Sequence, residues 1–184
     1  MALGVLALGG CAGVDSGQAA VSDAFRISQA EVDAQVREVV GQVQQAPGDP
    51  QPGVALGTTQ RLVQDALTEA KAAELGVSVT EAEVQAGVAE LRSQYGDQAG
   101  LEQAAAQANI PASQIDDFVR SRLLVERIAA ELGGGVAEAG AALGEYSEAV
   151  GLEISPRYGT WDPATLQIVP GSSVAEPAAS PAAG

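Results

Sequence analysis

Residues 75–95 read LGVSVTEAEVQAGVAELRSQY, and this stretch decides the fold class. Its Leu-Gly step ends one helix, because glycine is the common residue just past a helix C-terminus. Thr80 and Glu83 then match a capping box, in which each side chain binds the other residue's backbone amide. After this box, apolar side chains recur at helical spacing: Val84, Val88, Leu91 and Tyr95. The stretch therefore predicts two helices joined by a short connection.

Further helical patterns lie on the N-terminal side of this stretch. Ser28 and Glu31 form a second capping box, and valines come after it at spacings of three and four, so we expect a helix to begin at Ser28. The segment 46–57 is rich in proline and glycine and predicts a loop. The next helix is expected to begin near residues 58–59 and to end at the Leu-Gly step.

Three more helices are predicted on the C-terminal side. The first is a short alanine-rich helix over residues 101–108. Ser113 and Asp116 then open a long amphipathic helix, which ends at the glycines of residues 133–135. A weaker helical pattern covers residues 137–150. The central part of the chain is therefore expected to be all-helical.

Short strands are predicted at the two ends of the folded part. Residues 21–27 form the first candidate, and residues 152–154 and 165–169 flank a turn near the C-terminus. We expect the N-terminal strand to pair with the C-terminal segment, so that a small β element joins the chain ends. The fold class is accordingly mainly α, with one domain over residues 21–170. Removal of residues 151–184 should then cost several degrees of melting temperature.

The N-terminus has the composition of a lipoprotein signal peptide. An apolar run over residues 1–10 ends at Cys11, the only cysteine, and residues 8–11 resemble the lipobox of bacterial lipoproteins. We expect cleavage before Cys11, lipid on its thiol and anchoring to a membrane from outside the cytoplasm. Residues 11–20 would then be a tether, and residues 171–184 a disordered tail, since both segments contain mainly small and polar residues.

The apolar run is shorter than a usual signal sequence and has no basic residue before it, so we expect the start codon to lie upstream of Met1. After Cys11 no stretch approaches the roughly 18 consecutive apolar residues that span a bilayer. The lipid is therefore expected to supply the membrane affinity. An apolar N-terminus with a chance cysteine is the alternative, and it leaves the thiol unexplained.

Charge and residue inventory exclude several classes of function. The net charge is −15, and the nine basic residues are scattered, which argues against a nucleic-acid partner. The chain has no histidine, so Ser-His-Asp, Cys-His and histidine-based zinc sites are excluded. A Ser-Lys nucleophile would need the single lysine, Lys71, on a polar helix face. We therefore expect a protein without catalytic residues, metal or cofactor.

The order of these segments resembles the N-terminal chaperone module of the SurA and PrsA family of extracytoplasmic foldases. The resemblance rests on AVSD at residues 20–23 with the capped helix after it, on residues 62–83, and on IPAS at residues 110–113 leading into FVRSRLL at residues 118–124. It covers about residues 20–133. Arg157, Tyr158 and Gly159 are similar to a segment of actinobacterial lipoproteins that carry this module, where it returns to the N-terminal strand.

The resemblance implies a multihelical peptide-binding domain similar to those of SurA and trigger factor. Better-known members insert a parvulin prolyl isomerase domain, which relies on histidines and for which this chain has no room. The resemblance therefore implies a module that binds polypeptides without isomerase activity.

Candidate side chains for binding peptides are apolar residues on the predicted helices, and each has a second interpretation. An aromatic residue in so aliphatic a protein either lines a groove for peptides or belongs to the core, and for Phe118 the core is favoured. The candidates are Val84, Val88, Leu91, Tyr95, Phe118 and Tyr146.

Charged residues on the long helix also have two interpretations. Arg120, Arg122 and Arg127 could bind an anion, but pairing such as Asp116 with Arg120 four residues apart is favoured. Asp116 and Asp117 could form a carboxylate pair, yet adjacent helix residues point about 100° apart. They are better explained as first-turn acids that the helix dipole stabilises.

The sequence thus predicts a lipid-anchored chaperone-like protein that transiently binds unfolded secreted polypeptides. The alternative is a structural or interaction lipoprotein that docks one dedicated cell-envelope partner. Suppression of aggregation of several unrelated denatured proteins would distinguish the two.

Overall fold

A computed structural model describes residues 17–42 and 52–171. The predicted signal peptide, Cys11 and nearly all of the predicted C-terminal tail lie outside these ranges. Within them, no helix has the length and the hydropathy that a membrane span requires.

The described part of the chain is mainly helical, as predicted. Its helices are α1 (Gln29–Gln42), α2 (Pro52–Leu75), α3 (Glu81–Gln94), α4 (Gln98–Gln107), α5 (Ile115–Glu131) and α6 (Val136–Ala149), with a 3-10 turn, η1 (Ala112–Gln114), before α5. The strands are short: β1 (Gln18–Val21), β2 (Arg26–Ser28), β3 (Glu153–Ile154), β4 (Thr160–Asp162) and β5 (Gln167–Val169).

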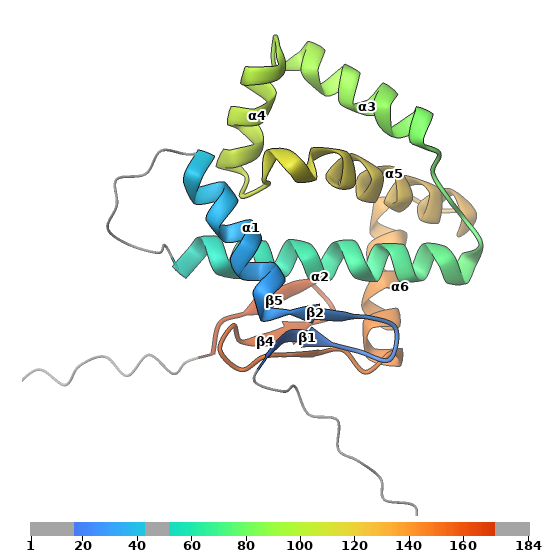
Figure 1. The fold of residues 1–184 in the computed structure, drawn as a ribbon. Coiled ribbons are helices and arrows are strands. Elements are labelled where there is room, and N and C mark those ends of the chain that lie inside the picture. Colours follow the sequence, from blue (N-terminus) through green and yellow to red (C-terminus); the bar gives the residue numbers. More distant parts are fainter. Residues whose placement is uncertain (1–16, 43–51, 172–184) are drawn as a thin grey trace, which may run out of the picture.

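Helix α2 is the central helix of the fold. It contacts α1, α5 and α6, and the strands lie on the side of α2 that faces away from α5 (Figure 1). The main core forms where these elements meet, and Val63, Leu67 and Ile128 are almost completely buried in it. The chain ends are therefore attached to the same apolar interior as the central helices.

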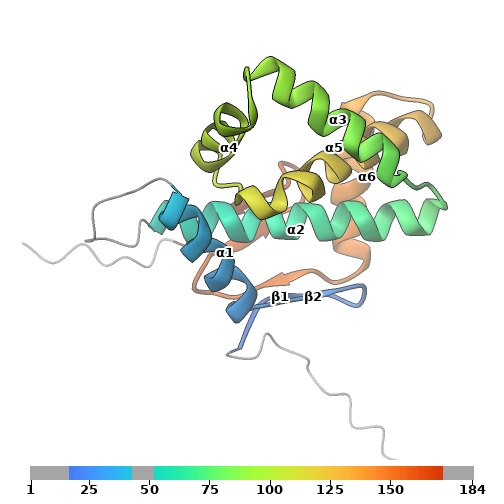
Figure 2. The same cartoon turned by 45° about the horizontal axis from the view of Figure 1, so that its top comes forward.

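A second, smaller core lies on the far side of α5. Helix α3 lies over α5 on the side away from α2, and α4 connects the end of α3 to the region of α1 (Figures 1 and 2). This core contains Val84 and Val88 of α3, Leu101 of α4, and Ile115 and Val119 of α5. Helix α5 thus contributes side chains to both cores.

The predicted pairing of the chain ends is confirmed for β1 and β3. They are antiparallel, with Ala20 opposite Ile154 and Val21 opposite Glu153. Together with β2 they form a three-stranded sheet of order β2-β1-β3, while β4 and β5 form a separate two-stranded sheet. The C-terminal segment is therefore part of the fold.

The N-terminal strand differs from the prediction. Residues 21–27 are not one strand, because Ser22 turns the chain: its backbone N–H and its hydroxyl both contact the carbonyl of Phe25. The result is a hairpin of β1 and β2. Ala19 and Ala20 were expected in the tether, yet both are fully buried in β1. The domain therefore begins a few residues before residue 21.

The predicted loop over residues 46–57 is wrong for its last six residues, which belong to α2, and its other residues lie outside the described ranges. Helix α2 begins at Pro52, six residues before the predicted start at residue 58. Proline suits the first turn of a helix because its fixed φ is helical and its missing N–H would have no helical partner. Val54 is buried, which stabilises this added turn.

The predicted capping box is confirmed in full at α3, and at α1 the serine half of the predicted box is present. The hydroxyl of Thr80 accepts from the N–H of Glu83, and the Glu83 carboxylate accepts from the N–H of Thr80 at 2.8 Å. At α1 the Ser28 hydroxyl accepts from the N–H of Glu31 at 3.1 Å. Ser113 is different: it does not cap α5 and instead donates its hydroxyl to Glu38 of α1 at 2.8 Å.

Candidate functional site

The predicted peptide-binding residues of α3 lie at different depths. Val84 is completely buried and Val88 is 5% exposed, so both belong to the second core. Leu91 is half-buried, and Tyr95, at the end of α3, is 52% exposed. Along this one helix the apolar stripe therefore passes from the interior to the surface.

Leu91, Tyr95 and Phe118 meet at one apolar cavity between α3, α4 and α5. The cavity has a volume of about 100 Å³. Its remaining lining comes from α4, the turn after it and the start of α5: Leu101, Ala104, Ala105, Ala108, Ile110 and Ile115. Every lining side chain is apolar except for the Tyr95 hydroxyl.

Phe118 lies at the margin of the second core. It is half-buried and packs against this core, and it also forms one wall of the cavity. Its packing agrees with the favoured core interpretation, while a contact with peptides stays a prediction.

Tyr146 lies elsewhere. It is in α6 and packs against the main core, with the ammonium of Lys71 5.2 Å from its ring centre. Lys71 also pairs with Glu74 at 2.6 Å. The structure therefore does not bring Tyr146 together with the cavity residues, and the sole lysine contacts an aromatic ring and a carboxylate.

The contribution of α4 to the cavity was missed by sequence reasoning. Ala104 and Ala108 indicate only a helix in the sequence, because alanine is a strong helix former with little apolar surface of its own. The small size of these side chains is the sequence feature that could have indicated a cavity, because it leaves space between α4 and its neighbours.

Ion pairs join α3 to α5 beside the second core. Arg120 pairs with Glu81 at 2.7 Å, and Arg127 pairs with Glu83. The predicted pair of Asp116 with Arg120 is wrong, because Arg120 reaches across to α3 while Asp116 accepts from Gln85 at 2.8 Å. Because α3 packs against α5, Arg120 and Arg127 each pair with a glutamate of α3. The spacing of residues within α5 alone cannot predict such partners.

These contacts affect the acidity of the α3 carboxyls. Hydrogen bonds from Gln85 and then Arg120 lower the pKa of Glu81. Hydrogen bonds from Thr80, with the charge of Arg127 beside it, lower the pKa of Glu83. The arginines of α5 are thus engaged mostly with carboxylates, which leaves no anion-binding cluster among Arg120, Arg122 and Arg127.

One half-buried carboxyl lies between α2 and α5. Burial raises the pKa of Asp65, although hydrogen bonds from Ser121 and Arg61 oppose the shift. Its ion pair with Arg61 measures 3.0 Å. Arg61 lies on α2 with Asp65, and Ser121 lies on α5. The Asp65 carboxylate therefore helps to hold these two helices together and does not need a functional role to explain it. In the described ranges no group of three or more metal-ligating side chains comes together.

Sequence comparison agrees with this architecture. The profile of the SurA-like N-terminal domain matches residues 1–129, which end inside α5. This family is associated with extracytoplasmic, chaperone-like proteins and with the binding of unfolded polypeptides. No curated protein and no solved structure matches the chain significantly. Since the match covers more than half of the sequence, the chain belongs to the SurA-like N-terminal domain family.

Proposed function

We propose that this protein is a lipid-anchored, extracytoplasmic chaperone-like protein that transiently binds unfolded secreted polypeptides and has no prolyl isomerase activity. The observation that carries the proposal is the apolar cavity between α3, α4 and α5, with Tyr95 exposed at its edge. The absence of histidine from the sequence supports binding without catalysis.

The size of the cavity suits weak and unselective binding. A closed apolar cavity of roughly 150 Å³ holds one benzene molecule, so about 100 Å³ accepts one aliphatic side chain. Apart from the Tyr95 hydroxyl the lining side chains are apolar, so they offer too few hydrogen bonds to select a sequence. One side chain at a time, held by apolar contact, gives the fast release that a transient holding protein needs.

The first test removes the exposed aromatic edge of the cavity. Tyr95→Ser should reduce suppression of aggregation of several unrelated denatured proteins, because clients lose a large apolar contact. We expect the protein concentration needed for half-suppression to rise roughly threefold to tenfold, as for loss of about 1 kcal/mol of binding. Light scattering during dilution of the clients from denaturant measures this.

The matched control is Val136→Ser, which removes an exposed apolar residue at the start of α6, away from the cavity. It should leave suppression unchanged, and both variants should melt like the wild type. Equal loss in both would contradict a role for the cavity. Activity toward a single protein would favour the dedicated-partner alternative, and catalysed isomerisation of a proline peptide would contradict the non-catalytic part of the proposal.

The lipid anchor is tested at Cys11. Only a thiol at this position can form the thioether to lipid, so Cys11→Ser should abolish incorporation of labelled palmitate in cells. It should also release the protein from the membrane fraction. The match of residues 8–11 to a lipobox supports this expectation. Retention of label in the variant would contradict the anchor while leaving polypeptide binding open to the previous test.

A further inference from the structure

Another cavity lies between α2, α5 and the connection from α2 to α3. It has a volume of about 230 Å³. Apolar side chains from all three segments form most of its wall: Ala72, Val77, Val79 and Leu124. Two charged side chains also line it, Glu69 of α2 and Arg120 of α5. We call this space the connection cavity.

The connection that closes one side of this cavity is fixed at both ends. Gly76 ends α2 with a φ of +68°, and the N–H of Val77 donates to the carbonyl of Ala72 at 3.0 Å. This is the Schellman pattern of a helix C-terminus. At the other end, the capping box of Thr80 and Glu83 begins α3. The wall of the cavity is therefore held in place without a ligand.

The apolar wall suits an alkyl chain. Ala72 is 2% exposed and Leu124 is 6% exposed, so these two side chains form the floor of the cavity. Val77 and Val79 are half-buried beside them. A closed apolar cavity of roughly 150 Å³ holds one benzene molecule, so about 230 Å³ has room for a chain of four methylene groups.

The carboxylate of Glu69 at this cavity has no basic partner. Among the residues that the structure describes, each ion pair joins other side chains, and none includes Glu69. The guanidinium of Arg120, which also lines the cavity, pairs with Glu81 at 2.7 Å. Glu69 is exposed, so a ligand in the cavity can reach its carboxylate.

The surroundings of Glu69 favour a positive charge. Asp65 lies one turn before Glu69 on α2, and Asp117 lies on α5, which packs against α2. Desolvation and then the charges of Asp65 and Asp117 raise the pKa of Glu69. The charge of Arg120 lowers it, but has the smallest effect of these. A cation beside Glu69 would offset the repulsion between the carboxylates, because an opposite charge favours the charged form.

We propose that the connection cavity binds lysine side chains of client polypeptides, with the methylene groups against the apolar wall and the ammonium group at Glu69. Lysine fits both features of the cavity, because it carries a compact ammonium on an apolar stem. The inference rests on the proposed binding of unfolded polypeptides and assigns a second site to it. The cavity between α3, α4 and α5 accepts an apolar side chain, and the connection cavity accepts a basic one.

Butylammonium and 1-butanol test this site, because both reproduce the lysine stem and only the first is charged. An NMR titration of the full chain at low ionic strength follows the methyl groups of Val77, Val79 and Leu124. Butylammonium should bind saturably and about threefold more tightly than butanol, as expected for one exposed ion pair. The difference should shrink as salt screens the carboxylates. Equal affinities of the two ligands at low ionic strength would overturn the role of charge.

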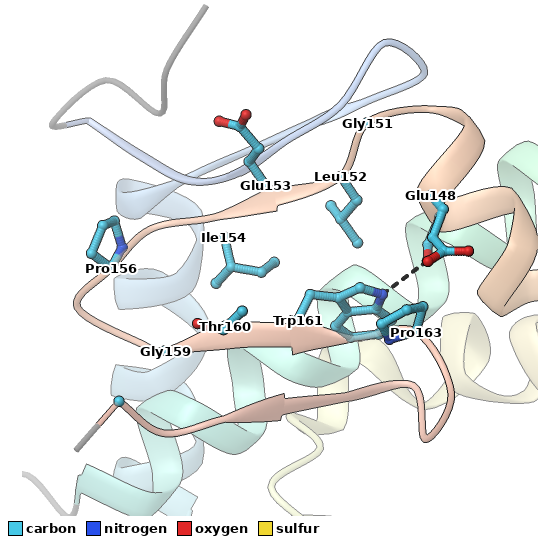
Figure 3. Close-up of a pocket in the computed structure, with 12 residues that line it drawn as sticks. Glu148, Gly151, Leu152, Glu153, Ile154, Pro156, Gly159, Thr160, Trp161 and Pro163 are labelled. Carbon is cyan, nitrogen blue, oxygen red and sulfur yellow. Dashed lines mark hydrogen bonds between the residues drawn. The ribbon is translucent and has the colours of Figure 1, made fainter.

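Glu69→Gln tests the location. It should weaken butylammonium binding about threefold and leave butanol binding unchanged, so that the two ligands bind equally. The control, Glu148→Gln, removes the same charge from an exposed site at the end of α6, beside a cavity of about 620 Å³ that also borders β3 and β4 (Figure 3). The control should change either affinity less than twofold. Equal effects of both substitutions would overturn the assignment by showing a response to net charge alone.

A pair of peptides extends the test to clients. A seven-residue alanine peptide with one central lysine should shift the same methyl resonances. Its Nε-acetylated form should bind about threefold more weakly, because acetylation removes the charge and keeps the stem. Equal binding of the two peptides would overturn the proposal for polypeptides.

Tyr95→Ser separates this site from the cavity between α3, α4 and α5. Tyr95 lines that cavity, so its replacement should leave butylammonium binding unchanged. Failure of that cavity to bind clients and failure of the connection cavity to bind butylammonium are therefore distinguishable. An equal loss of butylammonium binding in Tyr95→Ser and Glu69→Gln would overturn the assignment to the connection cavity.

Discussion

Deletion of residues 151–184 should abolish cooperative thermal unfolding, whereas deletion of residues 172–184 should leave the melting temperature unchanged. The longer deletion removes β3, β4 and β5 and with them three buried side chains of the main core: Ile154, Tyr158 and Ile168. It also leaves the β1 edge without the partner it has in β3. The sequence alone predicts that the melting temperature falls by several degrees, and the burial of these three side chains predicts a larger loss of stability.

The expected size follows from the apolar surface that the three side chains bury. Each buried isoleucine contributes about 1.5–3 kcal/mol, and a tyrosine buries on the order of 150–250 Å². Removal of Tyr158 also leaves Gln29 of α1 without the hydrogen bond that the tyrosine hydroxyl donates to it at 2.9 Å. The total approaches the roughly 5–15 kcal/mol by which whole domains are stable.

Circular dichroism during heating measures both truncations against the full chain. The full chain and the 172–184 deletion should give the same sigmoidal curve, and the 151–184 deletion should give a broad one without a clear midpoint. A cooperative transition of the longer deletion within a few degrees of the full chain would contradict the place of the C-terminal strands in the core.

Gly144→Ala should lower the free energy of unfolding by about 1–3 kcal/mol, the usual cost of overpacking. A Cβ atom at Gly144 would lie 2.3 Å from the carbonyl oxygen of Pro163, a backbone atom that cannot rotate away. The segment after β4 would have to move off α6, which would disturb the hydrogen bond from Trp161 to Ser147. At this chain length the melting temperature should fall by roughly 2–4 °C per kcal/mol.

Gly140→Ala is the matched control, one turn earlier in the same helix. A Cβ atom there has no neighbour within 4 Å, so only helix propensity acts. Alanine is favoured over glycine in a helix by about 1 kcal/mol, and the control should therefore be stabilised. Denaturant unfolding of both variants measures the two signs. Stabilisation by both substitutions would contradict the close contact of α6 with the segment after β4.

Local signals in the sequence located most helices because each depends on neighbouring residues alone. The capping boxes at Ser28 and Thr80 are of this kind, and both helices begin where predicted. The predicted start of α2 is six residues too late, because proline and glycine in residues 52–57 indicate a loop, although proline is also favoured at a helix start. Burial of Val54 decides between the two, and burial is not a local property.

The candidate site was predictable only in part for the same reason. Helical spacing placed Val84, Val88, Leu91 and Tyr95 on one face, and it could not say where along that face the core ends. Only the position of α4 over this end leaves Leu91 and Tyr95 beside a cavity.

The split of the apolar interior also bears on how the molecule fluctuates. Among the described residues, seven buried ones form the core beneath α3 and α4, against sixteen in the main core. A unit with fewer buried contacts opens more often than the whole domain unfolds, because its opening exposes less apolar surface. Excursions of α3 and α4 away from α5 uncover Leu101 and Ile115, which enlarges the apolar surface presented to a passing chain. Under the proposed function, the population of this open state, more than the resting volume of the cavity, would then set how strongly the protein binds a polypeptide.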